Sequence, residues 1–128
     1  MTRRSLALWL AATLGLAGAA LHAWGFVTAG PKIGAANLSP FLKGAYGALW
    51  FADSLATAIV APVALVAARR PGHVPISVMA LLSAIPIGTG LLILRFIGPF
   101  YASYLQILIG VLLLAGSTGS SDRQAPQQ

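Results

Sequence analysis

The chain has 128 residues, of which 58% are hydrophobic and only 8% are charged, against about 25% charged residues in an ordinary soluble domain. Eight Lys and Arg residues face two acids, Asp53 and Asp122, and the formal net charge is +6. This composition excludes both a soluble globular domain and a disordered protein. The absence of cysteine excludes disulfides, thiolate metal sites, iron–sulfur clusters and a cysteine nucleophile.

The charges are confined to clusters, and long apolar stretches separate them. A helix needs about 20 mostly apolar residues to cross a bilayer. Four stretches are long enough, and we expect transmembrane helices over residues 5–27, 40–69, 75–96 and 99–116. The predicted fold is therefore all-α, a polytopic membrane protein whose four helices form one antiparallel bundle. The polar tail, residues 117–128, is predicted to be disordered.

Local sequence signals support these boundaries. The segment 28–32, Thr-Ala-Gly-Pro-Lys, is expected to end the first helix. Ser39 is a suitable N-cap for the second helix, with Pro40 as its first residue. Gly98 and Pro99 predict a tight turn, which makes the last two helices antiparallel neighbours.

The first predicted helix has an alternative interpretation. Arg3 and Arg4 precede an apolar run and an Ala17-Gly18-Ala19 segment, a pattern typical of a cleaved secretory signal. The apolar run continues as far as Val27, however, which is long enough to span a bilayer. This length favours a retained helix over a cleaved signal.

The distribution of Lys and Arg predicts an orientation. If the N-terminus is cytoplasmic, the inner side carries Arg3, Arg4, Arg69, Arg70 and Arg123, and the outer side carries Lys32, Lys43 and Arg95. We therefore expect a multi-pass protein of the inner (plasma) membrane with both termini in the cytoplasm. The basic residues suit anionic lipid headgroups as partners. They form no continuous patch, so nucleic acid is not an expected partner.

Small residues recur at a spacing of four in every predicted helix, and helices in lipid associate where small residues allow close approach. We expect these stripes to face the interior of the bundle. They are Ala11, Gly15, Ala19 and Ala23 in the first helix; Ala48, Ala52 and Ala56 in the second; Ala80, Ala84 and Gly88 in the third; and Gly98, Ala102 and Gly110 in the fourth.

Asp53 is the acid inside a predicted span and the most informative residue of the chain. It lies ten residues beyond Lys43, which places it roughly 15 Å into the membrane at 1.5 Å per residue. An ionised carboxylate at that depth normally faces the protein interior with a partner. Tyr46, Trp50 and Asp53 share one face of the second helix, and the indole N–H of Trp50 also needs a partner.

Three residues of other helices could partner Asp53, since all of them are expected on the same outer side of the bilayer midplane. They are His22 in the outer part of the first helix, Arg95 near the outer end of the third, from which it could reach inward, and Gln106 in the outer half of the fourth. A cluster of these groups predicts either a proton-linked or small-solute site, or an internal pair that fixes helix packing. Both interpretations stay open. No nucleophile elbow, phosphate loop or dinucleotide motif is present, and we predict no catalytic, cofactor-binding or metal-binding residues.

Three short segments carry a resemblance to known proteins. They are Leu21-His22-Ala23-Trp24-Gly25-Phe26, Ala48-Leu49-Trp50-Phe51-Ala52-Asp53-Ser54 and Arg95-Phe96-Ile97-Gly98. Through them the chain resembles the small uncharacterised four-helix inner-membrane proteins of bacteria, a resemblance that implies no activity. Small multidrug transporters have a similar size, but their essential glutamate lies in the first helix, which here has no acid.

Three functional classes follow from these features. The first is a non-enzymatic accessory or scaffold subunit that binds a membrane protein, a second copy of the chain or lipid, since the chain is small and has abundant small-residue faces. The second is a proton-linked small-solute carrier or channel that uses Asp53. The third is a membrane enzyme acting on a lipid or quinone, which rests on His22, Asp53 and Arg95 alone.

Overall fold

A computed structural model describes residues 2–118, and its described part is built from four helices. They are α1 (Arg3–Ala35), α2 (Pro40–Arg69), α3 (Ile76–Phe96) and α4 (Tyr101–Ser117). The first three are long and apolar enough to cross a membrane, and α4 is a shorter apolar helix. The predicted all-α fold with four helices is confirmed. Of the predicted polar tail, Ser117 ends α4, and residues 119–128 lie outside the described residues.

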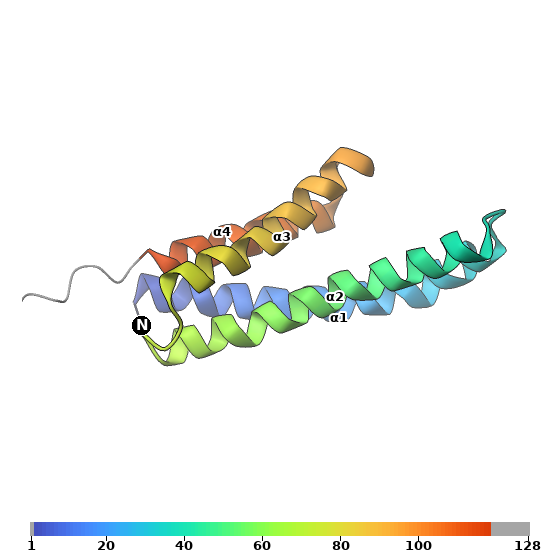
Figure 1. Cartoon of the computed structure of the whole chain (residues 1–128). Helices are drawn as coiled ribbons and strands as arrows, with labels where there is room; N and C mark the ends of the chain where they lie inside the picture. The colour runs from blue at the N-terminus through green and yellow to red at the C-terminus, as the bar shows by residue number, and fades with distance from the viewer. Residues whose placement is uncertain (1, 119–128) are drawn as a thin grey trace, which may run out of the picture.

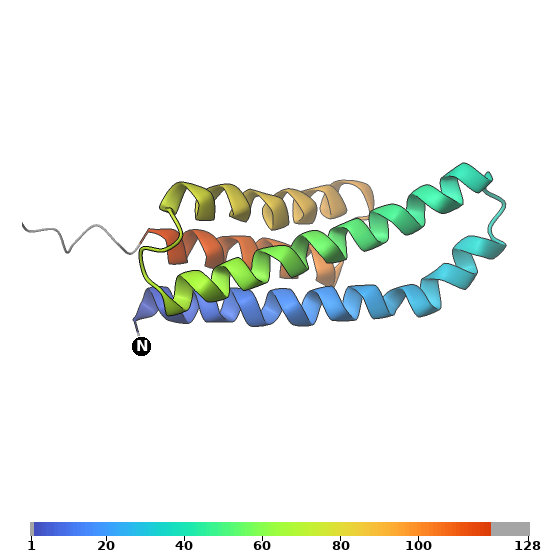
Figure 2. The same cartoon turned by 60° about the horizontal axis from the view of Figure 1, so that its bottom comes forward.

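The helices form two antiparallel hairpins, α1–α2 and α3–α4 (Figures 1 and 2). The hairpins pack together mainly through α1 and α4, whereas α2 and α3 touch only sparsely. In Figure 1 the hairpins lie close together near the N-terminus and diverge toward the α3–α4 turn. We call the end of the bundle that carries residues 97–100 and the tip of the α1–α2 hairpin the open end, and the opposite end the terminal end.

The two hairpins differ in length. At 1.5 Å per residue, the 33 residues of α1 extend about 50 Å, and the 17 residues of α4 only about 26 Å. At the terminal end the hairpins are joined, because the Arg4 guanidinium Nε donates to the carbonyl of Gly116 (2.9 Å). The difference in length therefore falls at the open end, where the α1–α2 hairpin continues past the α3–α4 turn (Figure 1).

Capping at the start of α2 agrees with the prediction. Ser39 is the N-cap, its hydroxyl accepts a hydrogen bond from the backbone N–H of Leu42 (3.3 Å), and Pro40 is the first helical residue. The predicted tight turn between α3 and α4 contains Gly98 with φ +99°, a left-handed conformation that favours glycine.

The predicted end of the first helix near Val27 is wrong. The helix continues through Pro31 to Ala35. A proline lacks the N–H that would bond the carbonyl four residues earlier, here that of Val27, and this costs less near an exposed helix end. The last turn is also tied to α2, since Lys43 Nζ donates to the carbonyl of Gly34 (2.6 Å).

The buried core lies in the terminal half of the bundle. Its largest fully buried side chains are Leu8, Met79, Ile109 and Leu113, one or two from each of α1, α3 and α4. Small residues of α2, including Ala61 and Ala64, complete it. Close approach of backbones is visible at Gly110, where an added Cβ would lie 2.9 Å from the carbonyl oxygen of Ser83.

The predicted small-residue stripes face the interior on α1, apart from the half-buried Ala23, and in part on α4, where Gly110 is buried and Ala102 half-buried; they are wrong on α2 and α3. Ala11, Gly15 and Ala19 of α1 are buried as expected. Ala48 and Ala52 of α2 and Ala80 and Ala84 of α3 are exposed instead. Alanine is so common in this chain that a spacing of four arises on several helix faces. The faces that pack are the ones that also carry the buried Thr57 and Ala61 of α2 and Ser83 and Gly90 of α3.

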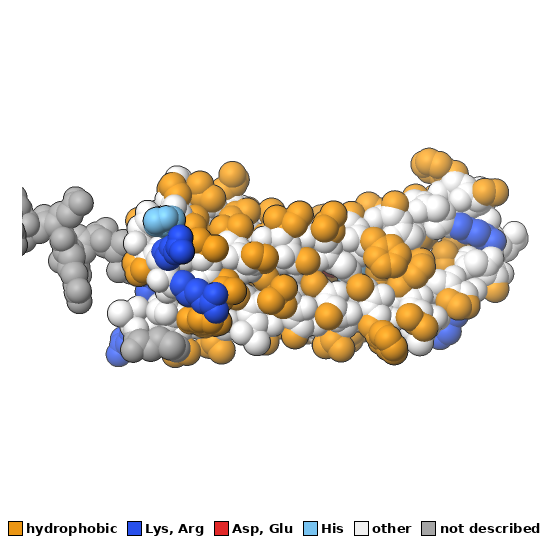
Figure 3. Space-filling view, turned by 90° about the horizontal axis from the view of Figure 1, so that it is seen from below, with side chains coloured by type: hydrophobic (Ala, Val, Ile, Leu, Met, Phe, Trp, Pro, Cys, Tyr) orange, Lys and Arg blue, Asp and Glu red, His pale blue; other side chains and the backbone are white. Residues whose placement is uncertain are grey.

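The surface has the layered composition of a membrane-spanning protein. Seen from the α1–α2 side, hydrophobic side chains cover the middle of the molecule, and Lys and Arg gather at its two ends (Figure 3). Large apolar side chains such as Leu16, Leu55 and Leu81 are exposed. A soluble protein would bury such side chains, whereas lipid tails solvate them without cost.

Candidate functional site

Asp53 lies at the junction of three helices. Its carboxylate oxygen Oδ2 is 3.3 Å from Nδ1 of His22 on α1. From α4, Nε2 of Gln106 lies 3.4 Å from Oδ1 and 3.5 Å from Oδ2. Together with their hydrogen-bonded neighbours, these residues form what we call the polar cluster: His22, Trp50, Asp53, Ser54, Thr57 and Gln106.

Trp50 contacts both the ring and the backbone of His22. The two rings are stacked, with centroids 4.6 Å apart and planes inclined by 13°. The indole Nε1–H of Trp50 donates to the backbone carbonyl of His22 (2.7 Å). The predicted need of this deep indole for a partner is thus met by a backbone group on α1, and the contact fixes where His22 meets α2.

Ser54 orients the imidazole of His22. Its hydroxyl donates to the carbonyl of Trp50 (3.3 Å), one turn earlier in α2, and its Oγ lies 3.1 Å from Nδ1 of His22. Since the Ser54 proton is used on that carbonyl, Oγ acts as an acceptor toward the ring. Nδ1 therefore faces two acceptors, Ser54 and Asp53, and carries a proton in this arrangement.

Gln106 is the buried member of the polar cluster that comes from the other hairpin, on α4. Its side chain is 8% exposed, and Nε2 also donates to the hydroxyl of Thr57 (3.1 Å). The two amide hydrogens thus face three oxygen atoms. The amide oxygen Oε1 is buried and has no hydrogen-bond partner among residues 2–118. Thr89 of α3 also lies near the Asp53 carboxylate.

The exposed fraction of the side chains in the polar cluster decreases from His22 and Asp53 to Thr57 and Gln106. The side chains of His22 and Asp53 are 31% and 22% exposed, whereas Thr57 and Gln106 are buried. Farther toward the terminal end follow the apolar core residues Ile109 and Leu113. The polar cluster is therefore uncovered on one side and closed on the side of the terminal end.

The structure brings together four of the six residues singled out in the sequence. His22, Trp50, Asp53 and Gln106 are joined by the contacts above. Arg95 is not among them: it is exposed, and its guanidinium carbon lies 5.5 Å from the ring centroid of Phe96. The set of His22, Asp53 and Arg95, on which an enzyme would rest, is therefore not assembled.

Tyr46 also lies outside the polar cluster, with 54% of its surface exposed. It shares a helical face with Trp50 and Asp53, but it lies nearly two turns from Asp53 toward the tip of the hairpin. Thr89 was missed in the sequence. The signal for it was present, since Thr89 is the sole polar side chain between Ser83 and Arg95.

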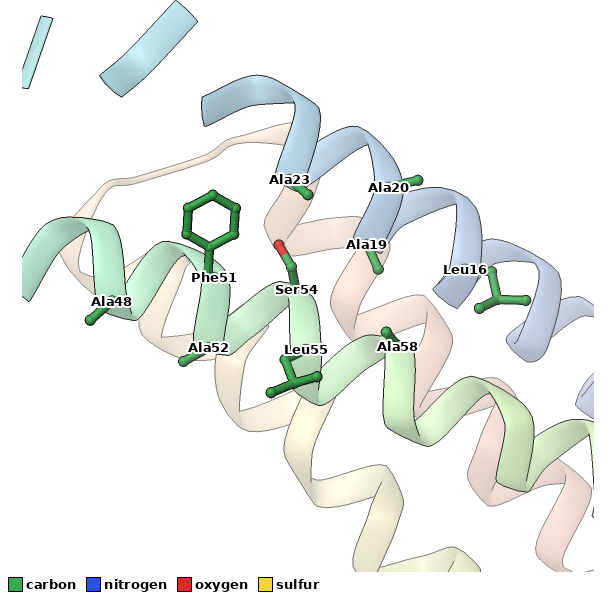
Figure 4. Close-up of a pocket in the computed structure, with 10 residues that line it drawn as sticks. All are labelled: Leu16, Ala19, Ala20, Ala23, Ala48, Phe51, Ala52, Ser54, Leu55 and Ala58. Carbon is green, nitrogen blue, oxygen red and sulfur yellow. The ribbon is translucent and has the colours of Figure 1, made fainter. Parts of the chain in front are cut away.

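An open hollow lies on the face of the α1–α2 hairpin that points away from α3 and α4, and it borders the polar cluster at Ser54 (Figure 4). It is lined by Leu16, Ala19, Ala20, Ala23, Ala48, Phe51, Ala52, Ser54, Leu55 and Ala58. In Figure 4 the Ser54 hydroxyl points from α2 toward α1, and α3 and α4 lie behind the hairpin. Two alanines of the predicted α2 stripe thus line this hollow instead of the bundle interior.

The polar cluster combines a carboxylate and an imidazole, two groups that can exchange a proton. Within residues 2–118 no group of three His, Cys, Asp or Glu side chains is placed to hold a metal ion. The acceptors of the polar cluster are instead one carboxylate, hydroxyls and an amide.

No protein-family model matches the chain, and no curated protein or solved structure is significantly similar to it.

Proposed function

We propose that this protein is a non-enzymatic accessory subunit of a membrane complex, and that it binds its partner through the part of the α1–α2 hairpin that continues past α3 and α4. The observation that carries the proposal is the unequal length of the hairpins. The hydrocarbon core of a bilayer is about 30 Å thick. The lengths of α3 and α4, about 32 Å and 26 Å, match it, whereas α1 exceeds it by about 20 Å.

The projecting part of the hairpin carries large apolar side chains. Trp24 is 73% exposed, and Val27, Phe41, Tyr46 and Leu49 are all more than half exposed. Lipid headgroups and interfacial water cover such surface poorly, because leaving apolar area in water costs roughly 25 cal/mol per Å². Aromatic residues are also the side chains most enriched in protein interfaces. A partner protein that docks beside the hairpin above the α3–α4 turn would cover this surface.

The expected location is the inner (plasma) membrane, with the terminal end on the cytoplasmic side. The terminal end carries Arg3, Arg4, Arg69 and Arg70, and the open end carries Lys32, Lys43 and Arg95. This asymmetry follows the positive-inside rule. The partner-binding surface would then face away from the cytoplasm.

Site-specific photo-crosslinking in the protein's own membranes tests this proposal. A photoreactive phenylalanine derivative replaces Trp24 or Tyr46, and a matched control replaces Leu81 of α3, which is exposed to the same degree as Trp24 (72% against 73%). We expect one discrete protein adduct from positions 24 and 46 and none from position 81. Adducts to lipid alone, or equal protein adducts from all three positions, would overturn the proposal. An adduct to a second copy of the chain would overturn the accessory-subunit proposal and indicate that the protein forms a homo-oligomer.

The polar cluster supports a second candidate, a proton-linked carrier or channel for a small solute. An ionisable carboxylate and an imidazole in contact inside the membrane are a common arrangement for moving protons. Among residues 2–118 the core between the polar cluster and the terminal end is closely packed and mainly apolar, so transport would require a rearrangement of the hairpins. Flux into proteoliposomes that is lost in Asp53→Asn but kept in Ser54→Ala would favour this candidate over the accessory subunit.

A further inference from the structure

We infer that the terminal end of the α1–α2 hairpin binds an anionic phospholipid, whose phosphate is held by Arg69 and Arg70 and whose acyl chain lies along an exposed apolar face of α2. This inference does not rest on the accessory function, because the site lies at the opposite end of the hairpin from the partner-binding surface. Three observations lead to it: the unbalanced charge of the terminal end, the fixed position of the Arg69 side chain, and the apolar face that begins beside it.

The terminal end carries positive charge that no acid among residues 2–118 balances. Lys and Arg side chains gather at this end in Figure 3, and the arginines there are Arg3, Arg4, Arg69 and Arg70. The sole acid of residues 2–118 is Asp53, which is paired with His22 and lies about 24 Å from Arg69 along α2. The C-terminal tail adds Asp122 and Arg123, whose charges cancel. A membrane surface can supply the missing negative charge as lipid phosphate.

Trp9 fixes the position of the Arg69 side chain. The guanidinium carbon of Arg69 on α2 lies over the Trp9 ring of α1, 5.0 Å from its centroid. A stacked guanidinium keeps its N–H donors at its edge, where two of them can hold two oxygens of one phosphate. The helices are joined beside this pair, since Ser5 Oγ donates to the carbonyl of Ala68 (3.5 Å). The donors of Arg69 are therefore preorganised, and less side-chain entropy is lost when an anion binds.

Arg70 adds a second guanidinium at the point where α2 ends. Its backbone is no longer helical (φ −126°, ψ 81°), and its carbonyl accepts a hydrogen bond from the backbone N–H of His73 (3.1 Å). This bond closes a tight turn through Pro71 and Gly72, whose φ is +89°. The side chain of Arg70 is exposed, as is that of Arg69. A phosphate at the end of α2 is thus accessible to two adjacent arginines.

The apolar face beside Arg69 favours a phospholipid over free phosphate. Residues spaced alternately four and three apart share one side of a helix. From Arg69 toward the middle of α2, this side carries Val66, Pro62, Ile59 and Leu55, all of which are exposed. Leu55 lies 14 residues before Arg69, a distance of about 21 Å, whereas half of the hydrocarbon core is about 15 Å thick. An acyl chain that descends from a phosphate at Arg69 can therefore contact this face throughout its own leaflet.

The site also lies at the expected level of the membrane. Trp side chains are enriched where the hydrocarbon core meets the headgroups, and Trp9 and Arg69 lie near the ends of two membrane-spanning helices. Basic sites between transmembrane helices on the cytoplasmic side are suited to anionic headgroups. The expected orientation of the chain places the terminal end on that side.

The test is the binding of phosphatidylglycerol to the purified protein in detergent, measured by native mass spectrometry against phosphatidylcholine with the same acyl chains. We expect the wild type to prefer phosphatidylglycerol, and each of Arg69→Gln and Arg70→Gln to weaken its binding about fivefold. The matched control is Arg95→Gln, since Arg95 is also an exposed arginine in the last turn of a helix and lies 5.5 Å from the ring centroid of Phe96. This control should bind phosphatidylglycerol as the wild type does.

Equal binding of the two lipids, unchanged binding of phosphatidylglycerol in the double variant of Arg69 and Arg70, or an equal loss in Arg95→Gln would overturn the inference. Glycerophosphoglycerol, the same headgroup without acyl chains, is expected not to compete. Competition at equal concentration would overturn the lipid assignment and indicate a site for free phosphate esters.

A second measurement reports where the lipid lies. Phosphatidylglycerol that is brominated on its acyl chains near the glycerol should quench tryptophan fluorescence more than the brominated phosphatidylcholine does, because bromine quenches only at short range. We expect this excess quenching to disappear in Trp9→Phe, which keeps an aromatic ring beneath Arg69, and to persist in Trp24→Phe. Excess quenching that persists in Trp9→Phe would show that the lipid binds elsewhere and would overturn the inference.

Discussion

A close approach of α3 and α4 at Gly110 makes a direct prediction for Gly110→Ala. A Cβ at this position would lie 2.9 Å from the backbone carbonyl oxygen of Ser83 and would clash with the side chain of Ile87. A side-chain tip moves aside cheaply, but a backbone oxygen does not, so the two helices must separate by several tenths of an ångström. Overpacking of this kind costs roughly 1–3 kcal/mol. We therefore expect Gly110→Ala to lower the free energy of unfolding by that amount.

The matched control is Gly88→Ala on α3. An added Cβ at Gly88 meets nothing within 4 Å, so this variant isolates the intrinsic gain in helix propensity, up to about 1 kcal/mol. Both variants are compared with the wild type by thermal unfolding in detergent, followed by tryptophan fluorescence. Equal midpoints for the two variants would refute the packing of α3 on α4 through Gly110.

Three further changes probe the core, the polar cluster and the end of α1. Leu8→Ala removes a fully buried side chain and is expected to cost roughly 2–5 kcal/mol, whereas Leu81→Ala, at an exposed position, leaves the unfolding midpoint nearly unchanged; similar losses would contradict the assigned core. Trp50→Phe keeps a ring stacked on His22 but leaves the His22 carbonyl without its donor. We expect the free energy of unfolding to fall by roughly 1–3 kcal/mol in the same assay, and we expect no loss for the control Trp24→Phe. Pro31→Ala is expected to retain or slightly raise helix content by circular dichroism, and a loss of helix would show that α1 does not continue through residue 31.

Depth in the membrane could be predicted from the sequence, and rotation about the helix axis could not. Counting residues from the charged ends placed His22, Gln106 and Arg95 on the same outer side of the midplane as possible partners of Asp53. His22 and Gln106 do meet Asp53, whereas the Arg95 side chain is exposed. A rise of 1.5 Å per residue fixes height, whereas each residue also turns the side chain by 100°. Which side of a helix faces the bundle interior depends on how the neighbouring helices pack against it.

The small-residue stripes show the same limit. Residues four apart share a face, so a stripe identifies a face on which close packing is possible, without identifying the face that packs. On α1 the stripe is buried, because Gly15 meets Ala61 across the interface, with 3.3 Å between the position of an added Cβ and the Ala61 Cβ. On α2 the face with Ala48 and Ala52 is left outside, since the interface uses the face that carries Thr57 and Ala61.

Side-chain size explains why the polar cluster lies where the hairpins diverge. Toward the terminal end the two hairpins approach closely, for example at Gly116 of α4, where an added Cβ would clash with the side chain of Leu8 on α1. At the level of Asp53 the same interface must hold the glutamine side chain of Gln106, and beside it the stacked rings of His22 and Trp50. Large groups hold helices apart, and the space that opens admits polar partners from the other hairpin. The exposure of Asp53 and the divergence of the hairpins are thus two consequences of one change in residue size along the interface.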